Sequence, residues 1–385
     1  MVNGPLWCYF YAMKYVDNEN PMASMRFSCT QVGPNSLVYG TEDDLRKGLS
    51  SIETYAKPER VFAMNNCSVS LVGDDVQGIA DQMDLPWPVY AMDSGGMKGS
   101  FEAGYSAASL RIEKEMKTKE KIPASANVLG LSTVHMKGRE DAEEIRRLLS
   151  LCGIRVISMP GGGSNWEDIM DAPSASLNIV VRDELGLSLA KQMEQDFGTP
   201  YMSCGLPYGA DGTMVWLSEI IEKLGAGELT CASHEAAKLK EFLLRKGNNL
   251  ESLWGPLWFD AVLISAPPSE ALGIAEAIRS EWIDTARLCI HAQCETKKST
   301  PAADAIRVVM KNEKEIAKDY EDWQGGLVLS SSHETHLLRR MGRSFTGFHI
   351  ALPSHDEVHF SDLPQCGLRG AGYLYEQLWN AKLRK

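Results

Sequence analysis

The sequence of 385 residues predicts an α/β fold of three small doubly wound domains with parallel sheets. Short β-rich apolar runs alternate with longer amphipathic stretches along almost the whole chain, which is typical of βαβ units. The short runs are nearly continuously apolar, as expected for parallel strands that helices cover on both faces. Each third of the chain carries its own strand–loop–helix series, so we expect three sheets rather than one large sheet.

The first third contains one clear strand and one clear helix. Arg60–Met64 (RVFAM) is predicted to be a strand, and apolar periodicity predicts a helix from Asp75 to Met83. Cys67 is expected in the loop between them. A charged run closed by a proline, Lys114–Ala126, then predicts a solvated connector between domains.

The middle third alternates regularly between strands and helices. The helix expected after the first strand has acidic residues in its first turns, which favours a helix N-terminus. The predicted strands are Asn127–Ser132, Ile154–Ser158, Ser176–Val181 and Pro200–Ser203. The predicted helices are Arg139–Leu151, Arg182–Phe197 and Thr213–Leu224.

The last third begins after Gly225 with a rise in charge density and a long predicted helix, Cys231–Lys246. Its predicted strands are Ala261–Ser265, Ala286–His291, Leu327–Ser330 and Phe348–Leu352. Its further predicted helices are Ser269–Trp282, Ala302–Tyr320, Glu334–Met341 and Gly370–Lys382. The expected domains are therefore 1–122, 123–245 and 246–385.

Composition excludes several classes of protein. Hydrophobic residues make up 44% of the chain and charged residues 23%, which excludes a disordered, collagen-like or coiled-coil chain. The formal net charge of −12 argues against nucleic acid or an anionic membrane surface as the main partner. The sequence has no apolar run of the ~18 residues that a membrane span needs.

The nine cysteines are too scattered for a disulfide scaffold, and no signal segment opens the sequence. We therefore expect a cytoplasmic protein with reduced thiols. Cys8 lies in a Gly-Pro turn and Cys67 directly follows a predicted strand, where ligands of doubly wound sheets bind. Thiolates in such loops bind soft metals or iron–sulfur clusters, whereas free cysteines elsewhere are usually buried packing residues. The spacing of these two cysteines does not by itself decide between the two interpretations.

Several longer segments, spread over nearly the whole chain, carry a family resemblance. The sequence resembles the nitrogenase component 1 superfamily, which includes nitrogenase subunits, their cofactor-assembly scaffolds and the dark protochlorophyllide reductases. The similar segments occur in the family's order: NGPLWCY (Asn3–Tyr9), Ser36–Leu49, Pro58–Ile79, Met92–Ala108, Gly161–Val180, Phe197–Ile220, Leu327–Gly342 and Gly367–Ala381.

The resemblance implies three Rossmann-like domains and a dimer of identical or similar subunits. It also implies an iron–sulfur cluster at the subunit interface, held by Cys8 and Cys67, and a separate ATP-dependent iron–sulfur protein that delivers electrons. The sequence has no GxxxxGK[ST] phosphate loop, which fits nucleotide handling by another protein.

The cysteine set also departs from nitrogenase. Nitrogenase subunits have a further cluster cysteine upstream of the one matched by Cys8, and no cysteine precedes Cys8 here. Two matched cysteines in each chain of a homodimer would supply the thiolates of one [4Fe–4S] cluster, which we favour. A larger, P-cluster-like cluster would need extra ligands. Cys29 is the spare candidate, with a core position as its alternative.

Three histidines in C-terminal loops are candidates for proton donation to a substrate, because imidazole titrates near neutral pH. They are His333, His355 and His359. Nitrogenase holds its catalytic metal cofactor with one cysteine and one histidine, the histidine lying shortly before a "G.RG" motif. His355 and His359 stand near that place, without a secure match in spacing. Packing at a sheet edge, or for His333 a helix N-terminus, is the alternative.

The leading hypothesis is a nitrogenase-like iron–sulfur reductase component. It would take electrons from the ATP-dependent iron protein and reduce a substrate bound between its domains. The modest length and small cysteine set resemble the tetrapyrrole-reducing and methanogen-type members, among them a nickel–tetrapyrrole reductive cyclase. The alternatives are a metal-cluster assembly scaffold of the same fold, or a non-redox protein that binds a small molecule or metal chelate.

Overall fold

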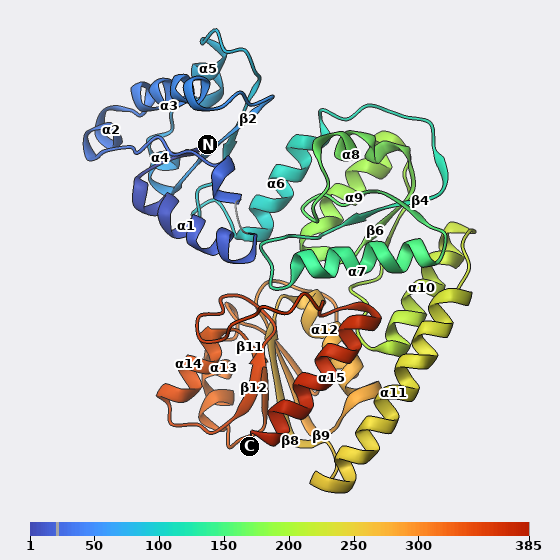
Figure 1. Ribbon diagram of the computed structural model, residues 1–385. Coiled ribbons are helices and arrows are strands. Elements are labelled where there is room, and N and C mark those ends of the chain that lie inside the picture. Colours follow the sequence, from blue (N-terminus) through green and yellow to red (C-terminus); the bar gives the residue numbers. More distant parts are fainter. Residues whose placement is uncertain (21–22, 385) are drawn as a thin grey trace. The chain divides into compact units, whose positions relative to one another are not determined.

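The computed structural model describes residues 1–20 and 23–384, and its elements are labelled in Figure 1. The predicted fold class is confirmed: the chain is an α/β protein with three parallel sheets of three, four and five strands. Its internal contacts divide the chain into two compact units, Met1–Arg111 and Ile112–Lys385. No helix within the described residues is both long enough and apolar enough to cross a membrane.

The first unit contains the three-stranded sheet, in the order β1-β2-β3. Acidic residues occupy the first turn of α3, and Leu45 and Leu49, one turn apart, face the core of this unit. The strands are β1 (Val2–Asn3), β2 (Val61–Asn65) and β3 (Val89–Asp93). The helices are α1 (Leu6–Glu19), α2 (Pro34–Tyr39), α3 (Glu42–Tyr55), α4 (Cys67–Val72), α5 (Val76–Asp81) and α6 (Phe101–Glu113), with a 3₁₀ turn at Ala23–Arg26.

The second unit begins with the four-stranded sheet, in the order β5-β4-β6-β7. Of its two central strands, Ser125–Leu129 is buried throughout and Ala175–Val180 is buried at all but one residue, as a sheet covered on both faces requires. The strands are β4 (Ile122–Leu129), β5 (Arg155–Ser158), β6 (Ala175–Val180) and β7 (Tyr201–Ser203). The helices are α7 (Gly138–Leu151), α8 (Trp166–Asp171), α9 (Asp183–Phe197), α10 (Ala210–Leu224) and α11 (Thr230–Trp254), with a 3₁₀ turn at Ala172–Ser174.

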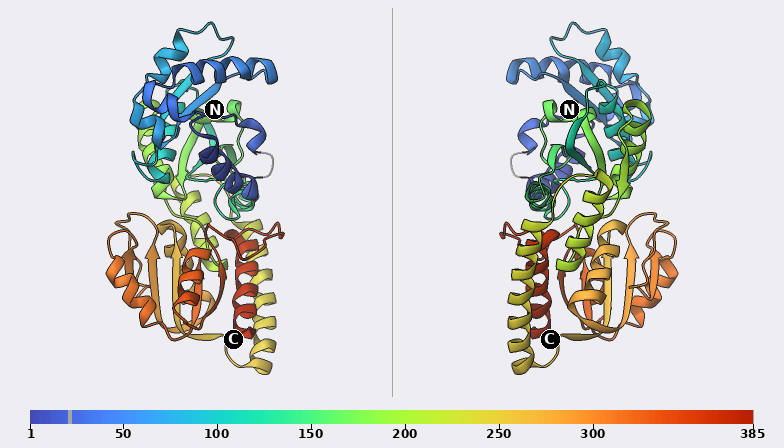
Figure 2. Two further views of the ribbon diagram at one scale, coloured as in Figure 1. Left: turned by 90° about the vertical axis from the view of Figure 1, so that its left-hand side faces the viewer. Right: turned by 90° about the vertical axis from the view of Figure 1, so that its right-hand side faces the viewer.

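The five-stranded sheet follows, in the order β10-β9-β8-β11-β12. The strands are β8 (Trp258–Ala266), β9 (Asp284–Ala292), β10 (Ala305–Val308), β11 (Leu327–Ser330) and β12 (Thr346–His349). The helices are α12 (Pro268–Ala277), α13 (Glu313–Glu321), α14 (Ser332–Arg340) and α15 (Gly367–Leu383), with a π-helical turn at Ile278–Trp282. α15 runs alongside α11 (Figure 2) and also packs on α7, α10 and β12, so one continuous core serves both sheets.

Several predicted elements were wrong in kind or in extent. The helix expected over Ala302–Tyr320 is a short edge strand, β10, followed by the separate helix α13. The strand expected at Asn127–Ser132 begins earlier, inside the charged run, at Ile122. The helix expected to end at Lys246 continues to Trp254, and α1 was not predicted at all.

The division into three domains at 122/123 and 245/246 stays a prediction. Apart from the first residue of β4, each of the three sheets lies within one of the predicted ranges. The contacts, however, join the four-stranded and five-stranded sheets into one unit. The shared core under α15 is the physical reason, because side chains from both sheets pack into it.

Candidate functional site

The first unit brings two distant segments together at one edge of its sheet. β1 and β2 are parallel neighbours, with Asn3 opposite Asn65. Both asparagines are buried, and the Asn3 side-chain amide donates a hydrogen bond of 3.1 Å to the Asn65 side-chain oxygen. The chain therefore leaves both strands at the same carboxyl edge, which is where ligands of such sheets bind.

The segments after these strands approach so closely that only glycine fits at position 4. A Cβ atom on Gly4 would lie 2.5 Å from Cγ of Asn66. The Asn66 backbone N–H donates to the Asn3 carbonyl at 3.1 Å, and its side-chain oxygen accepts from the Val69 N–H at 3.1 Å. Asn66 is thus the N-cap of α4, and this cap fixes Cys67 as the first residue of that helix.

Cys8 and Cys67 are both exposed, each a few residues beyond the end of its strand. The Cys67 Sγ accepts a hydrogen bond of 3.1 Å from the Gly96 N–H. The sequence predicted a Gly-Pro turn for Cys8 and a loop for Cys67. Both positions are corrected, because Cys8 lies in the first turn of α1 and Cys67 in the first turn of α4.

Cys29 lies beside the same edge, but its thiol is already engaged. It is partly buried, bridges to Val2 of β1, and donates to the Gly4 carbonyl at 3.3 Å. Burial is the main cause that raises its pKa, and the charge of Cys8 contributes in the same direction. Burial thus disfavours the thiolate of Cys29, which is the form that binds metals. Cys29 therefore differs from the exposed pair.

The first turns of α1 expose an aromatic patch beside Cys8. Trp7, Phe10 and Tyr11 have exposed side chains, and their rings contact one another edge to face or tilted. The Phe10 and Tyr11 centroids are 5.5 Å apart. Contiguous exposed apolar surface of this kind marks an interaction site more often than an ordinary surface.

The C-terminal histidines do not form one cluster. His333 is exposed near the start of α14, whose N-terminus is closed by a capping box between Ser331 and Glu334. His355 is also exposed, and its backbone N–H donates to Ser332 Oγ at 2.7 Å. His359 is partly buried and lies near His349, which the sequence did not single out. His349 ends a buried strand, where a histidine is easily taken for a packing residue.

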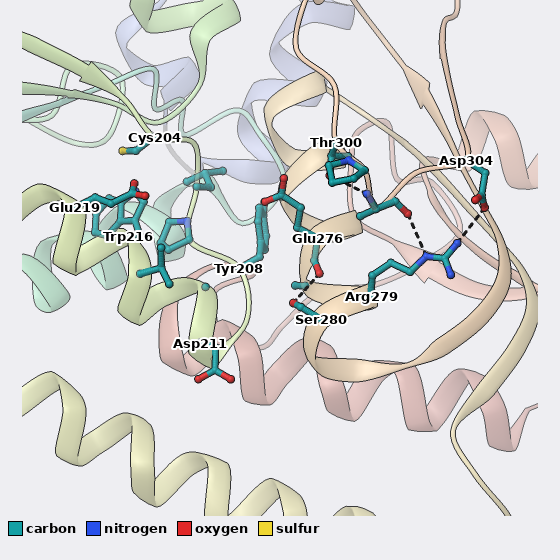
Figure 3. A pocket seen from close by; sticks show the side chains of 18 residues that line it. Cys204, Tyr208, Asp211, Trp216, Glu219, Glu276, Arg279, Ser280, Thr300 and Asp304 are labelled. Atoms are coloured by element: carbon teal, nitrogen blue, oxygen red, sulfur yellow. Dashed lines mark hydrogen bonds and ion pairs between the residues drawn. The ribbon is translucent and has the colours of Figure 1, made fainter.

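The second unit contains a cavity of about 950 Å³ between the α10 and α12 regions (Figure 3). The figure labels ten of its lining residues: Cys204, Tyr208, Asp211, Trp216, Glu219, Glu276, Arg279, Ser280, Thr300 and Asp304. Arg279 forms an ion pair of 3.0 Å with Asp304. Among the described residues that line this cavity, Arg279 is the only lysine or arginine, so the other lining carboxylates have no cation within the lining. Burial raises the pKa of Cys204 to about 12, so this cysteine is a neutral thiol.

A buried charge network lies close to the carboxyl ends of β4, β6 and β8. The Arg182 guanidinium is fully buried and bonds to Glu270 at 2.6 and 2.8 Å. The Asp141 Oδ2 lies 4.0 Å from Arg182 Nη2, and the Asp141 Oδ1 accepts hydrogen bonds from the backbone N–H groups of Gln365 and Cys366. These bonds tie α7 and α12 to the segment before α15, so the network fixes the arrangement of the second unit.

Comparison with known proteins gives the chain a family. The sequence model described as "Nitrogenase component 1 type Oxidoreductase" matches residues 1–383. The chain belongs to this family. The predicted family and the predicted class of oxidoreductase are thereby confirmed.

Individual family members are similar at low identity. The nitrogenase iron-molybdenum cofactor biosynthesis protein NifE of Clostridium pasteurianum is 28% identical over 260 residues, which cover 66% of this chain and 54% of that protein. A subunit of the light-independent protochlorophyllide reductase of Chlorobium phaeobacteroides (strain BS1) is 24% identical over 388 residues, covering 90% and 69%. The chain thus spans only about half of the NifE protein.

A solved structure titled "Nitrogenase Cp1 at pH 6.5" has the same fold. It superimposes with a TM-score of 0.76 at 16% identity and covers 100% of this chain and 88% of that chain. At this identity the likeness shows the fold alone. The family typically binds iron–sulfur clusters.

The donor set at the β1–β2 edge fits such a cluster. Cys8 and Cys67 present exposed thiols from neighbouring strand ends, and neither is in a disulfide. Thiolate sulfur is the usual protein ligand of iron–sulfur clusters. One chain offers two exposed thiols here, so a cluster with four thiolate ligands would need further donors from a second chain.

Proposed function

We propose that this chain is the substrate-reducing component of a nitrogenase-like system. It takes electrons from a separate ATP-dependent iron–sulfur protein through a cluster held by Cys8 and Cys67, and it delivers them to a bound substrate. The observation that carries this proposal is the exposure of both thiols at the carboxyl edge of paired strands, in a chain of an oxidoreductase family. When bound, an iron–sulfur cluster supplies one-electron transfer.

The chain's own residues shape this site in three ways. The close packing of Gly4 on Asn66 holds the two cysteine-bearing segments together. The Gly96 N–H donates to the Cys67 sulfur, and hydrogen bonds to ligand sulfurs help to set the reduction potential. The bond from Cys29 to the Gly4 carbonyl keeps that thiol out of the ligand set we propose.

A dimer completes the ligand set. Two chains, identical or similar, would supply four thiolates, the ligand number of one [4Fe–4S] cluster. The exposed aromatic patch of Trp7, Phe10 and Tyr11 begins next to Cys8 and supports a subunit interface there. One of the relatives is itself named as a subunit. A larger cluster would require ligands beyond Cys8 and Cys67.

We assign the substrate site to the cavity shown in Figure 3. Its volume of about 950 Å³ is large enough for a bulky organic substrate, and its wall includes the ring of Trp216. Its described lining includes four carboxylates and one cation, Arg279, which would favour a substrate with little negative charge. Proton donation by His333, His355 and His359 stays a prediction, and His359 lines a second cavity of about 410 Å³.

An electron-loading experiment tests the proposal. The tagged, anaerobically purified chain is incubated with a reduced nitrogenase-type iron protein, with or without ATP, and is then recaptured on resin. The electrons it carries are counted by titration with an oxidising dye. We expect about one electron per cluster with ATP and none without it. Equal loading by NADPH in the absence of the iron protein would contradict the proposal.

A scaffold that assembles a metal cluster is the second candidate, and the similarity to NifE favours it. The two functions differ in the fate of iron. A scaffold gives up its cluster to an acceptor protein, so its iron content falls as the acceptor's rises. A reductase retains its iron through repeated cycles of reduction and oxidation. Measuring iron on the recaptured chain before and after the loading experiment separates them.

A further inference from the structure

The loop after β12 folds back on the end of that strand and gathers three metal-binding side chains. His349 is the last residue of β12, and Glu357 and His359 lie on the returning loop. One donor atom from each of the three lies within 4.8 Å of the other two. His349 is buried, and the other two are partly buried.

Hydrogen bonds join these residues to one another and to Ser354, whose Oγ lies 3.3 Å from His359 Nε2. The His349 backbone N–H donates to Glu357 Oε2 at 2.9 Å, and the His349 Nδ1 lies 2.7 Å from Ser354 Oγ. The Nε2 atom lies 3.4 Å from Thr335 Oγ1 and 4.0 Å from Glu357 Oε1, whereas the Ser354 hydroxyl occupies Nδ1. A ligating histidine usually has its second nitrogen held in this way.

The carboxylate stands between the two imidazoles without a direct hydrogen bond to either. The His349 Nε2 is 4.0 Å from Glu357 Oε1, and the His359 Nε2 is 3.9 Å from Glu357 Oε2. Hydrogen bonds between such groups are about 2.7–3.2 Å long. Two ligands of a tetrahedral ion at its usual bond length lie about 3.3 Å apart, so shifts below about 1 Å would bring these atoms onto one ion.

We propose that His349, Glu357 and His359 bind a single divalent transition-metal ion. Two imidazoles and one carboxylate suit zinc or ferrous iron, and they leave coordination positions open for water or a ligand. The set contains no cysteine. Cys366, the cysteine nearest in sequence, is buried and directs its thiol at the Asp141 carbonyl, at 3.9 Å. The proposed site is therefore a different arrangement from the cysteine-and-histidine pair that holds the nitrogenase cofactor.

The surroundings admit and favour a cation. All three residues line a cavity of about 410 Å³, which Glu376 also lines. The Asp356 carboxylate lies 3.4 Å from His349 Nε2, and its other oxygen forms an ion pair with Arg339. Lys137, which donates to the Ser361 carbonyl, and Arg384 supply opposing charge nearby. An ion at this site would remove His359 from the free proton donors.

Zinc binding to the complete, anaerobically purified chain tests the proposal. Wild type and variants are dialysed against a buffered series of free Zn²⁺ concentrations, and bound zinc per chain is measured by elemental analysis. We expect one zinc per chain in wild type, with affinity lowered at least about 100-fold in His349→Ala and His359→Ala. Glu357→Gln, which keeps the size of the side chain, should also bind more weakly.

The exposed histidines provide matched controls. His333→Ala and His355→Ala remove an imidazole from the same region without touching the three proposed ligands, so their zinc affinity should equal that of wild type. Iron content, measured in the same samples, checks that each variant remains folded and keeps the separate site at Cys8 and Cys67. Equal zinc binding in all variants, or none in wild type at micromolar free Zn²⁺, would overturn the proposal.

Discussion

Replacing Gly4 by alanine should loosen the start of α4 and the segment that carries Cys67. The new Cβ would lie 2.5 Å from Asn66 Cγ and 2.6 Å from its side-chain nitrogen, closer than packed atoms approach. Gly4 is buried, and its carbonyl accepts from both the Val32 N–H and the Cys29 thiol, so the backbone cannot move away freely. The Asn66 side chain must therefore leave its capping position.

The expected cost has two parts. Overpacking in a closed site costs about 1–3 kcal/mol, and losing an asparagine N-cap costs about 1 kcal/mol. The sum is about 2–4 kcal/mol of local stability at α4. Since 1.4 kcal/mol is a factor of ten, amides of α4 that exchange through local opening should exchange roughly 30-fold to several hundred-fold faster.

Hydrogen–deuterium exchange of a peptide covering residues 66–72 measures this effect, because it reports on α4 rather than on unfolding of the whole chain. Asn66→Gly removes the obstructing side chain and should itself cost only a few tenths of a kcal/mol, because glycine is tolerated at N-caps. The double variant Gly4→Ala/Asn66→Gly should then exchange like Asn66→Gly alone. Gly104→Ala, where a Cβ meets nothing within 4 Å, is the steric control.

The outcome of this cycle is decisive for the packing argument. If the peptide of residues 66–72 in Gly4→Ala exchanges within twofold of its wild-type rate, the inference that a Cβ at position 4 clashes with Asn66 is wrong. If the double variant is as labile as Gly4→Ala, the cause lies elsewhere than in the Asn66 side chain. Iron content of the same variants should follow the exchange result, falling in Gly4→Ala and recovering in the double variant.

Further predictions concern the second unit. Arg182→Met should lower the free energy of unfolding by about 3–5 kcal/mol in urea titrations, because it leaves Glu270 buried without its partner. Burial raises the pKa of Asp141 to about 6, above its unfolded value, so its stabilising contribution is present at low pH and is lost as pH rises through about 6. Asp141→Asn should therefore flatten the decline in thermal stability between about pH 4 and pH 6. Glu281→Ala should cost about 1 kcal/mol, because the carboxylate accepts from the Ala210 and Gly212 N–H groups at the start of α10, and a thermal midpoint equal to wild type would contradict this.

The fold was predictable because its parallel strands are buried on both faces. Runs such as Leu327–Leu329 of β11 and Val262–Ile264 of β8 are continuously apolar and buried or nearly so. β10 was not predicted because it is a short edge strand with only partly buried residues, and its sequence continues into the helix-forming residues of α13. α1 was not predicted because Trp7, Phe10 and Tyr11 face outward, so no amphipathic pattern marks it.

The candidate site was predictable only in part, for similar reasons. Family resemblance pointed to Cys8 and Cys67, but sequence spacing alone could not indicate that β1 and β2 are neighbours, since β1 has only two residues. Nothing in the sequence distinguished His349 from a packing residue at the end of a strand. Its proximity to Glu357 and His359 depends on how the loop after β12 folds back, which no local pattern encodes.

The central claim is that Cys8 and Cys67 hold an iron–sulfur cluster shared between chains. The most direct measurement is iron and acid-labile sulfide per chain in anaerobically purified wild type, Cys8→Ala, Cys67→Ala and the buried-cysteine control Cys152→Ala. We predict about two iron and two sulfide per wild-type chain, the content of one [4Fe–4S] cluster per dimer. Both ligand variants should lose this iron, and the control should keep it. Full iron in Cys8→Ala and Cys67→Ala would contradict the account.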